Sequence, residues 1–303
     1  MYSGKVTADT SCAATERNTR LSTRPFDEER SLNQPHVAVI TGAARGQGRS
    51  HAVGLAEQGV DIIAVDRCAD IDSIPYPLAT QEDLAETVRL VEAAGARIHP
   101  VIADVRDLGT LRAGVDSGVD ALGEIDIVVA NAGVVGIGLP DPLDEQVFTD
   151  IVDTNLKGVW NTIAATVPSM IRGARGGSII LVSSMQGLIG RGGDGSAAIF
   201  AYAASKHGVV GLMRSAANAY APHRIRVNSL HPTGVGTPMI LNEHMAAMFA
   251  ANPEGSAMSG NLLPDVPFID AADVTDSVLF LASDKARQIT GVALPVDAGH
   301  AVM

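Results

Sequence analysis

The chain has 303 residues, of which 46% are hydrophobic and 18% charged, a composition typical of a globular protein. Its formal net charge of −12 argues against nucleic acid or an anionic membrane as a partner, because their phosphates would repel it. The longest stretch without Asp, Glu, Lys or Arg covers only 16 residues, so we expect no membrane span. Cys12 and Cys68 are the only cysteines, so we expect no disulfide framework and a location in the reducing cytoplasm.

Residues 1–35 mix charges with many Ser and Thr and show no apolar period, so we expect a flexible N-terminal tail. They also lack the basic-then-hydrophobic build of a secretory signal. From residue 36 to residue 303, apolar runs alternate with helical patterns, and we expect one domain there.

A glycine-rich turn follows the first apolar run of that domain. Residues 37–40 are small or β-branched and uncharged, which predicts a strand buried on both faces. The glycines that follow allow a sharp turn and a close approach of the main chain to a pyrophosphate. The free N–H groups at the start of the next helix would then point at that pyrophosphate. An ordinary strand-to-helix turn is the alternative. The dinucleotide interpretation assigns cofactor contacts to Gly42, Arg45, Gly46, Gln47 and Gly48.

The second apolar run, residues 61–66, ends on Asp66, 18 residues after Gly48. An acidic residue at this place hydrogen-bonds the adenosine ribose hydroxyls and repels a 2′-phosphate, so it favours NAD over NADP. Arg45 and Arg67 are basic residues of the kind that hold a 2′-phosphate. We expect the carboxylate of Asp66 to dominate this choice, with Arg67 also beside the cofactor.

The connection formed by residues 70–80 is longer than a strand-to-helix link needs. Pro75 and Pro77 prevent a regular helix within it, and the next helix is expected to begin at Thr80-Gln-Glu-Asp83. Because the connection leaves the sheet edge that would hold the adenosine, we expect it to cover the cofactor.

Further apolar runs complete the predicted sheet, at residues 98–103, 125–130, 178–183, 225–230 and 291–297. With helical patterns between them, they predict an α/β fold, a Rossmann-type doubly wound parallel sheet of about seven strands with helices on both faces. The carboxyl ends of parallel strands meet at one edge of a sheet. The residues after two of these strands should therefore line the adenine and ribose, namely Asp104, Val105, Asn131, Ala132 and Gly133.

Tyr202 and Lys206 are four residues apart at the expected start of a helix, on one face and a turn apart. Oxidation of an alcohol by nicotinamide needs a base, and a tyrosine can serve when nearby positive charge stabilises its phenolate. We assign Tyr202 as this base and Lys206 as the charge. Ser184 would hold the substrate oxygen, with Ser183 as the alternative, and Asn155 would hold a water that links Lys206 to solvent. Taken alone, such a Tyr/Lys pair is more often an ordinary helix surface.

Segment 238–269 is rich in methionine and is expected to be irregular. Its methionines, Met239, Met245, Met248 and Met258, could simply fill a core. Thioethers also adapt to apolar ligands, so we favour a mobile lid over a hydrophobic alcohol.

The histidines show no paired metal-ligand spacing beside carboxylates. We expect no catalytic metal, and packing or solvated roles for His51, His207, His231, His244 and His300.

Together these motifs resemble the short-chain dehydrogenase/reductase family from about residue 36 to the C-terminus. The resemblance rests on Thr41-Gly42-x-x-x-Gly46-x-Gly48, Asn131-Ala-Gly133, Asn155, Ser184, Tyr202-x-x-x-Lys206 and the loop Pro232 to Thr237. The mycofactocin-associated branch, which includes carveol dehydrogenase-like proteins, is similar in three further features: the run Arg45 to His51, the long connection after Asp66, and His231-Pro-Thr-Gly-Val235.

The resemblance implies an NAD-dependent alcohol dehydrogenase or ketoreductase that acts on a secondary, hydrophobic or alicyclic alcohol. It implies a homotetramer and, for this branch, a nicotinamide that stays bound and is reoxidised in place by an external redox carrier. It also implies a catalytic tetrad and further cofactor contacts. The tetrad is Asn155, Ser184, Tyr202 and Lys206, and the further contacts are Tyr202, Lys206, Pro232, Val235 and Thr237.

The sequence departs from the family pattern in three places. Ala130 and Thr233 stand where the family commonly has Asn and Gly, and neither change removes a catalytic group. Ser184 and Tyr202 are 18 residues apart, a longer spacing than is usual, and we expect the extra residues around 191–195 to form a surface bulge over the site. Two alternative functions fit the same fold: a binding protein that senses NAD redox state without turnover, and an NAD-using epimerase or lyase.

Overall fold

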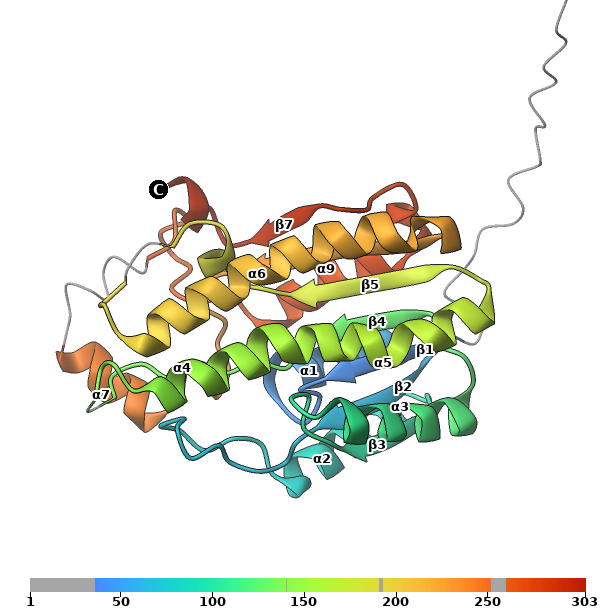
Figure 1. The fold of residues 1–303 in the computed structure, drawn as a ribbon, viewed down its shortest axis with the longest axis horizontal. Helices are drawn as coiled ribbons and strands as arrows, with labels where there is room; N and C mark the ends of the chain where they lie inside the picture. Colours follow the sequence, from blue (N-terminus) through green and yellow to red (C-terminus); the bar gives the residue numbers. More distant parts are fainter. Residues whose placement is uncertain (1–35, 140, 191–192, 252–259) are drawn as a thin grey trace, which may run out of the picture.

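The computed structural model describes residues 36–303, except 140, 191–192 and 252–259. The tail predicted for residues 1–35, Met258 and part of the bulge predicted around 191–195 lie outside the described residues. Within the described part, seven parallel strands form one sheet in the order β3-β2-β1-β4-β5-β6-β7 (Figure 1). The strands are β1 (His36–Thr41), β2 (Val60–Asp66), β3 (Ile98–Ile102), β4 (Ile127–Ala130), β5 (Gly177–Val182), β6 (Ile225–Pro232) and β7 (Ala293–Val296). The predicted doubly wound parallel sheet is confirmed.

Helices cover both faces of the sheet, each through its own hydrophobic core (Figure 1). One face carries α3 (Leu108–Leu122), α5 (Gly158–Gly173) and α6 (Ala197–Tyr220), and the other carries α1 (Gly46–Ala56), α2 (Gln81–Ala93) and α9 (Ala271–Ala282). Neighbouring residues of β1 serve different cores, since Val39 packs in the first and Ile40 in the second. The central strands are therefore continuous apolar runs rather than alternating ones.

Two helical regions differ from the expectation. The helix expected around Asn155 is divided into α4 (Glu145–Val152), a single π-helical turn η1 (Asp153–Lys157), and α5. Segment 238–269, expected to be irregular, contains α7 (Glu243–Ala251). Short 3₁₀ turns complete the fold, namely η2 (Met185–Gly187), η3 (Ala221–His223), η4 (Asp284–Ala286) and η5 (His300–Val302).

The strand order places three predicted site segments around one crevice. β1 has β2 and then β3 on one side and β4 on the other, so the winding direction of the sheet reverses at β1. Ligands of such sheets bind beyond the carboxyl ends of the strands at this reversal. The glycine turn follows β1, Asp66 ends β2, and Asn131 follows β4.

Judged by length and hydropathy, none of the helices in the described part of the chain could cross a lipid bilayer.

Candidate functional site

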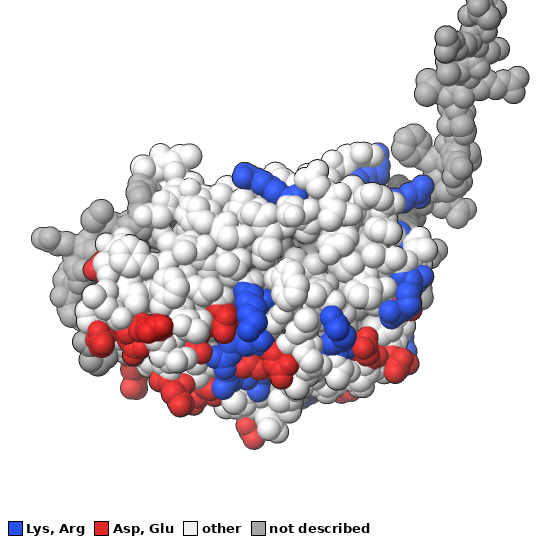
Figure 2. Space-filling view, in the orientation of Figure 1, with Lys and Arg blue, Asp and Glu red and all other residues white. Residues whose placement is uncertain are grey.

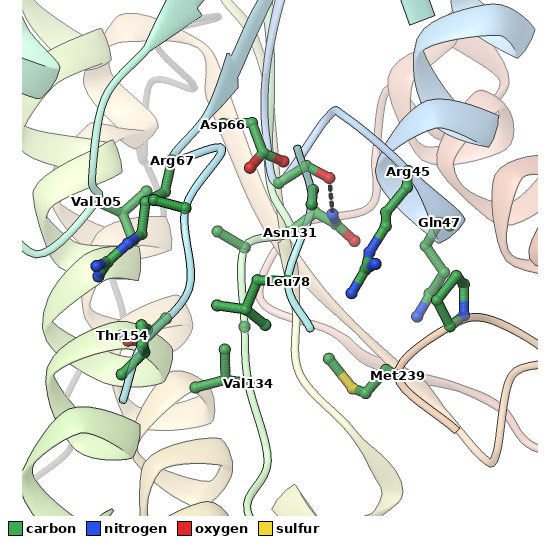
Figure 3. Close-up of a pocket in the computed structure, with 18 of the residues that line it drawn as sticks. Arg45, Gln47, Asp66, Arg67, Leu78, Val105, Asn131, Val134, Thr154 and Met239 are labelled. Atoms are coloured by element: carbon green, nitrogen blue, oxygen red, sulfur yellow. Dashed lines mark hydrogen bonds between the residues drawn. The ribbon is translucent and has the colours of Figure 1, made fainter. Parts of the chain in front are cut away.

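The glycine turn after β1 is too tightly built to hold side chains at its glycines. Gly42 and Gly46 have φ values of +67° and +55°, a backbone region that favours glycine. A Cβ added at Gly48 would lie 2.0 Å from the Gly42 carbonyl oxygen. Asn131 Nδ2 donates to the carbonyl oxygens of Thr41 and Gly42, at 3.0 and 3.3 Å, and so ties the turn to the end of β4 (Figure 3). This bare turn at the N-terminus of α1 fits the pyrophosphate of a dinucleotide.

Asp66 lies at the ribose end of the same pocket (Figure 3). Its two carboxylate oxygens accept hydrogen bonds from Ala44 N at 3.0 Å and Cys68 N at 3.1 Å. The carboxylate is thereby fixed on the pocket wall. The position suits hydrogen bonds to ribose hydroxyls and disfavours a 2′-phosphate.

Both arginines that could hold a 2′-phosphate already bind protein groups. Arg67 Nη1 donates to Asp104 Oδ2 at 2.9 Å, and its Nη2 donates to the Asp70 carbonyl oxygen at 2.6 Å. Arg45 Nη2 donates to the Pro77 carbonyl oxygen at 2.6 Å. Although burial raises the pKa of Asp104, hydrogen bonds and positive charge from Arg106, together with the charge of Arg67, hold it below its usual value. Asp104 therefore stays a carboxylate that anchors Arg67.

The long connection after β2 forms one wall of the pocket. Several of its side chains line the pocket, namely Ala69, Ile71, Tyr76, Leu78 and Ala79. Tyr76 is buried, and its hydroxyl accepts a hydrogen bond from Val135 N at 3.2 Å, which joins the connection to the loop after β4. Burial is the main cause that raises the pKa of Tyr76 to about 12, so the hydroxyl is neutral. At its far end, the connection passes into α2 through the expected Thr80/Asp83 capping box.

The structure brings Ser184, Tyr202 and Lys206 together. Ser184 follows β5, and its side chain lies close enough to Tyr202 to lower the pKa of the tyrosine hydroxyl. Lys206 Nζ lies 5.6 Å from the centre of the Tyr202 ring and donates to the Val182 carbonyl oxygen at 3.0 Å. Burial lowers the pKa of Lys206 to about 8. Burial also raises the pKa of Tyr202, opposite to what a general base needs, and the Ser184 side chain partly offsets this.

Ser183 faces away from Tyr202. Its hydroxyl donates to the Lys206 carbonyl oxygen at 2.9 Å, and its side chain is buried between β5 and α6. Ser184 Oγ instead accepts from Gln186 N at 3.2 Å, at the start of η2. The geometry thus separates the two serines that the sequence left open.

Asn155 supports the main chain after β4. From the π-helical turn, its Oδ1 accepts from Val134 N and its Nδ2 donates to the Val134 carbonyl oxygen, both at 2.8 Å. A Cβ added at Gly133 would lie 3.2 Å from Asn155 Oδ1 and 3.5 Å from Lys206 Nζ. Glycine at position 133 thus keeps the space beside these two polar atoms open.

Most predicted cofactor residues line the pocket, but some lie outside its lining. Tyr202 and Lys206 do not line it. Gly48 packs against the Gly42 carbonyl within the turn, Pro232 ends β6, and Val235 is buried in a bridge with Ile269. Sequence reasoning missed Val134 and Thr154, which directly neighbour Gly133 and Asn155. The residues that line the pocket as predicted are Gly42, Arg45, Gly46, Gln47, Asp66, Arg67, Asp104, Val105, Asn131, Ala132, Gly133 and Thr237.

The segment after β6 closes the other end of the pocket. Thr237, Pro238 and Met239 line it, and Met239 belongs to an apolar cluster that also includes Tyr76 and Tyr202. On α7, His244 Nε2 hydrogen-bonds the Ile137 carbonyl oxygen. The surroundings of Tyr202 are thus largely apolar.

Among the described residues, no group of three or more His, Cys, Asp or Glu side chains is placed to hold a metal ion.

Comparisons with known proteins agree with this geometry. The family model for short chain dehydrogenases matches residues 36–246. The (−)-trans-carveol dehydrogenase of Rhodococcus erythropolis is 49% identical over 272 residues, which cover 87% of this chain and 96% of that protein. The crystal structure of carveol dehydrogenase from Mycobacterium avium in complex with NAD superposes with a TM-score of 0.82 at 47% identity, covering 88% of this chain and 98% of that one. A short chain dehydrogenase from Mycobacterium paratuberculosis bound to NAD has a TM-score of 0.81 at 45% identity, with the same coverage of both chains.

Proposed function

Since this chain belongs to the short-chain dehydrogenase/reductase family, we propose that it interconverts a secondary, hydrophobic alcohol and its ketone, with Tyr202 as general base or acid. The protein is an NAD-dependent oxidoreductase of the alcohol dehydrogenase type. The observation that carries the proposal is the grouping of Ser184, Tyr202 and Lys206. Lys206 Nζ lies 5.6 Å from the centre of the tyrosine ring and beside Gly133, which lines the dinucleotide pocket.

NAD, when bound, takes up the hydride that leaves the alcohol carbon. In the oxidation direction Tyr202, as phenolate, removes the hydroxyl proton of the substrate, and in the reduction direction it returns that proton. Ser184, beside Tyr202, holds the substrate oxygen. Lys206 is mostly protonated near neutral pH, and its positive charge favours the phenolate that burial disfavours.

We assign the proton exit to Asn155 and Lys206. Asn155 Oδ1 and Lys206 Nζ lie 3.2 and 3.5 Å from the position that a Cβ atom would take at Gly133. A water molecule there would accept from the ammonium and donate to the amide oxygen. It would pass the proton from Lys206 toward solvent.

We assign the cofactor contacts to the pocket lining and infer that NAD leaves the pocket slowly. The wall formed by the connection after β2 is fastened at both sides, by Arg45 to the Pro77 carbonyl oxygen and by Tyr76 to Val135 N. These contacts must open before a nucleotide enclosed behind them can exchange. Reoxidation in place by an external redox carrier, as in a mycofactocin-dependent system, fits such a pocket.

The apolar surroundings of Tyr202 support a hydrophobic substrate. The cluster that contains Tyr202 also contains Ile71, Val135 and Met239, so a strongly polar alcohol would lose its hydration there without replacement partners. The relative from Rhodococcus is named for (−)-trans-carveol, an alicyclic secondary alcohol. We propose that segment 238–269 forms the lid over this substrate.

A homotetramer is supported by the surface of the chain. Charged side chains gather mainly in the lower half of the view in Figure 2, and the face over α6 is almost free of them. Large apolar side chains are exposed on α5 and α6, with Trp160 and Phe200 exposed to 49% and 60%. Large exposed apolar side chains on a face with few charges are typical of an interface between protein chains. The scarcity of cysteine supports a cytoplasmic location.

The decisive experiment asks whether an alcohol reduces a nicotinamide that the protein already holds. The purified protein is denatured and any released nucleotide identified, and the intact protein is given (−)-trans-carveol or cyclohexanol with either an artificial dye or added NAD. We expect NAD in the released fraction, and turnover with the dye that added NAD alone does not sustain.

Each other outcome rejects a defined part of the proposal. Rapid turnover with free NAD would remove slow exchange and indicate an ordinary dehydrogenase. Bound NAD with no reduction by either alcohol would favour a redox sensor. An isomerised product without net oxidation would favour an epimerase or lyase. Tyr202→Phe, which keeps the ring, serves as the inactive control.

The two serines are separated by Ser183→Ala and Ser184→Ala. We expect Ser184→Ala to lower kcat at least about hundredfold, because it removes the hydroxyl beside Tyr202. Ser183→Ala should act mainly on stability, since its hydroxyl supports the main chain of α6. Loss of turnover in the Ser183 variant alone would overturn the assignment.

A further inference from the structure

His231 joins β6 to the segment that carries Ser184. The side chain is fully buried near the end of β6. Its Nδ1 lies 2.7 Å from the Ser184 carbonyl oxygen, and its Nε2 lies 2.8 Å from Ser229 Oγ. The sequence pattern suggested a packing or solvated role for this histidine, and the mechanism above does not use it.

These two contacts determine the protonation of the ring. A carbonyl oxygen can only accept, so Nδ1 must carry a hydrogen and donate it to Ser184. In a neutral ring Nε2 is then an acceptor, and the Ser229 hydroxyl donates to it. Burial, and to a lesser degree the charge of Lys206, lower the pKa of His231, despite the hydrogen bond with Ser184. The ring is therefore neutral near neutral pH, with its single donor aimed at the Ser184 peptide group.

Two further hydrogen bonds hold Ser184 within its own short turn. Its carbonyl oxygen also accepts from Gly187 N at 2.8 Å, and its hydroxyl oxygen accepts from Gln186 N at 3.2 Å. Both partners belong to η2, which would move together with Ser184. His231 instead stands on β6, a strand paired on both sides within the sheet, so it fixes the serine to the rigid part of the fold.

We propose that His231 is a positioning residue for the reaction: by holding the Ser184 peptide group, it keeps the Ser184 hydroxyl aligned with Tyr202. The inference rests on the role of Ser184 proposed above. Catalytic groups must be held to within a fraction of an ångström, and supporting hydrogen bonds provide that alignment. Ser229 contributes by selecting the tautomer that donates to Ser184.

The test combines substitutions at His231 with Ser184→Ala in a double-mutant cycle. His231→Leu removes the donor. His231→Asn places an amide N–H close to where Nδ1 was, whereas His231→Gln places its amide near the position of Nε2. Turnover of (−)-trans-carveol with an artificial dye, NAD affinity, and the urea midpoint are measured for each variant.

We expect His231→Leu and His231→Gln to lower kcat by about ten- to a hundredfold with NAD affinity unchanged, and His231→Asn to recover most of the loss. In the Ser184→Ala background, His231→Leu should cause no further loss, because its effect passes through that hydroxyl. If His231→Leu does not fold, the kcat values of His231→Asn and His231→Gln are compared instead, and this comparison tests the same inference.

Other results overturn the inference in distinguishable ways. Equal losses in the Ser184→Ala and wild-type backgrounds, or equal activities of the Asn and Gln variants, would show that His231 only supports packing. Full activity of Ser184→Ala alone would instead reject the proposed role of Ser184. A lowered urea midpoint with unchanged kcat would assign His231 to stability.

Discussion

Replacing Lys206 with methionine should stabilise the protein near pH 7 while it abolishes turnover. Lys206 is buried on α6, and burial lowers the pKa of its ammonium group from 10.5 to about 8. A lowered folded-state pKa means that the folded chain holds this proton less firmly than the unfolded chain. At about 1.4 kcal/mol per pKa unit, the buried charge costs roughly 3 kcal/mol of stability near neutral pH.

One lost interaction offsets part of this gain. Lys206 Nζ donates to the Val182 carbonyl oxygen at 3.0 Å, and removing that hydrogen bond should cost about 1 kcal/mol. Methionine has a similar unbranched shape and adapts to the vacated space. The net expectation is therefore a variant about 2 kcal/mol more stable than the wild type near neutral pH.

The stability difference should shrink as the pH rises. Between pH 8 and 10.5 the folded chain has released the Lys206 proton and the unfolded chain still binds it, so wild-type stability increases with pH. The variant lacks this group and should not share the increase. By about pH 9.5, roughly 2 kcal/mol of the difference should have disappeared.

Urea denaturation of both proteins near neutral pH and near pH 9.5 measures these quantities. Nucleotide is first removed from both, because bound NAD would add its own binding free energy to stability. A variant less stable than the wild type at neutral pH, or a difference that stays constant with pH, would refute the reasoning. Retained turnover would show that Lys206 does not act in the chemistry.

Other positions give equally direct expectations. Gly48→Ala should abolish NAD binding or folding, since its Cβ would lie 2.0 Å from the Gly42 oxygen. Gly211→Ala, which meets nothing within 4 Å on α6, should stabilise the fold in urea by about 1 kcal/mol. Burial lowers the pKa of His51 from 6.5 to about 3, so between these pH values the unfolded chain binds a proton that the folded chain does not. The unfolding free energy should therefore fall by about 2 kcal/mol from pH 7 to pH 5. The variant His51→Leu should not show this fall. Asp66→Asn should narrow the preference for NAD over NADP about tenfold in kcat/KM.

The sheet and the cofactor turn could be predicted because their signals are local. A strand buried on both faces must be a continuous apolar run, as β1, β2 and β4 are. The predicted runs fall on all seven strands, although the edge strands β3 and β7 are only partly buried. A turn that closes onto its own carbonyl oxygen must use glycine, so Gly42 and Gly48 stand out in the sequence. The Thr80/Asp83 capping box fixes the start of α2 for the same kind of reason.

What could not be predicted depends on partners far apart in the chain. The sequence does not show that Arg45 binds the Pro77 carbonyl oxygen rather than a phosphate. It also does not show which of Ser183 and Ser184 binds the Lys206 carbonyl oxygen, because that contact joins residues far apart in the chain. Burial raises the pKa of Tyr202, and that effect exists only once the surrounding elements have packed.

The π-helical turn at Asp153–Lys157 has a consequence for how this site is encoded. A π-helical turn contains one residue more than an α-helical turn, and each residue rotates a helix by about 100°. Deleting one residue beside Asn155 would let α4 and α5 join as a continuous α-helix. The deletion would preserve every side chain of the candidate site, yet it would turn Asn155 away from Val134. The position of Asn155 thus depends on the length of a helix, and a comparison of residue identities alone does not reveal this.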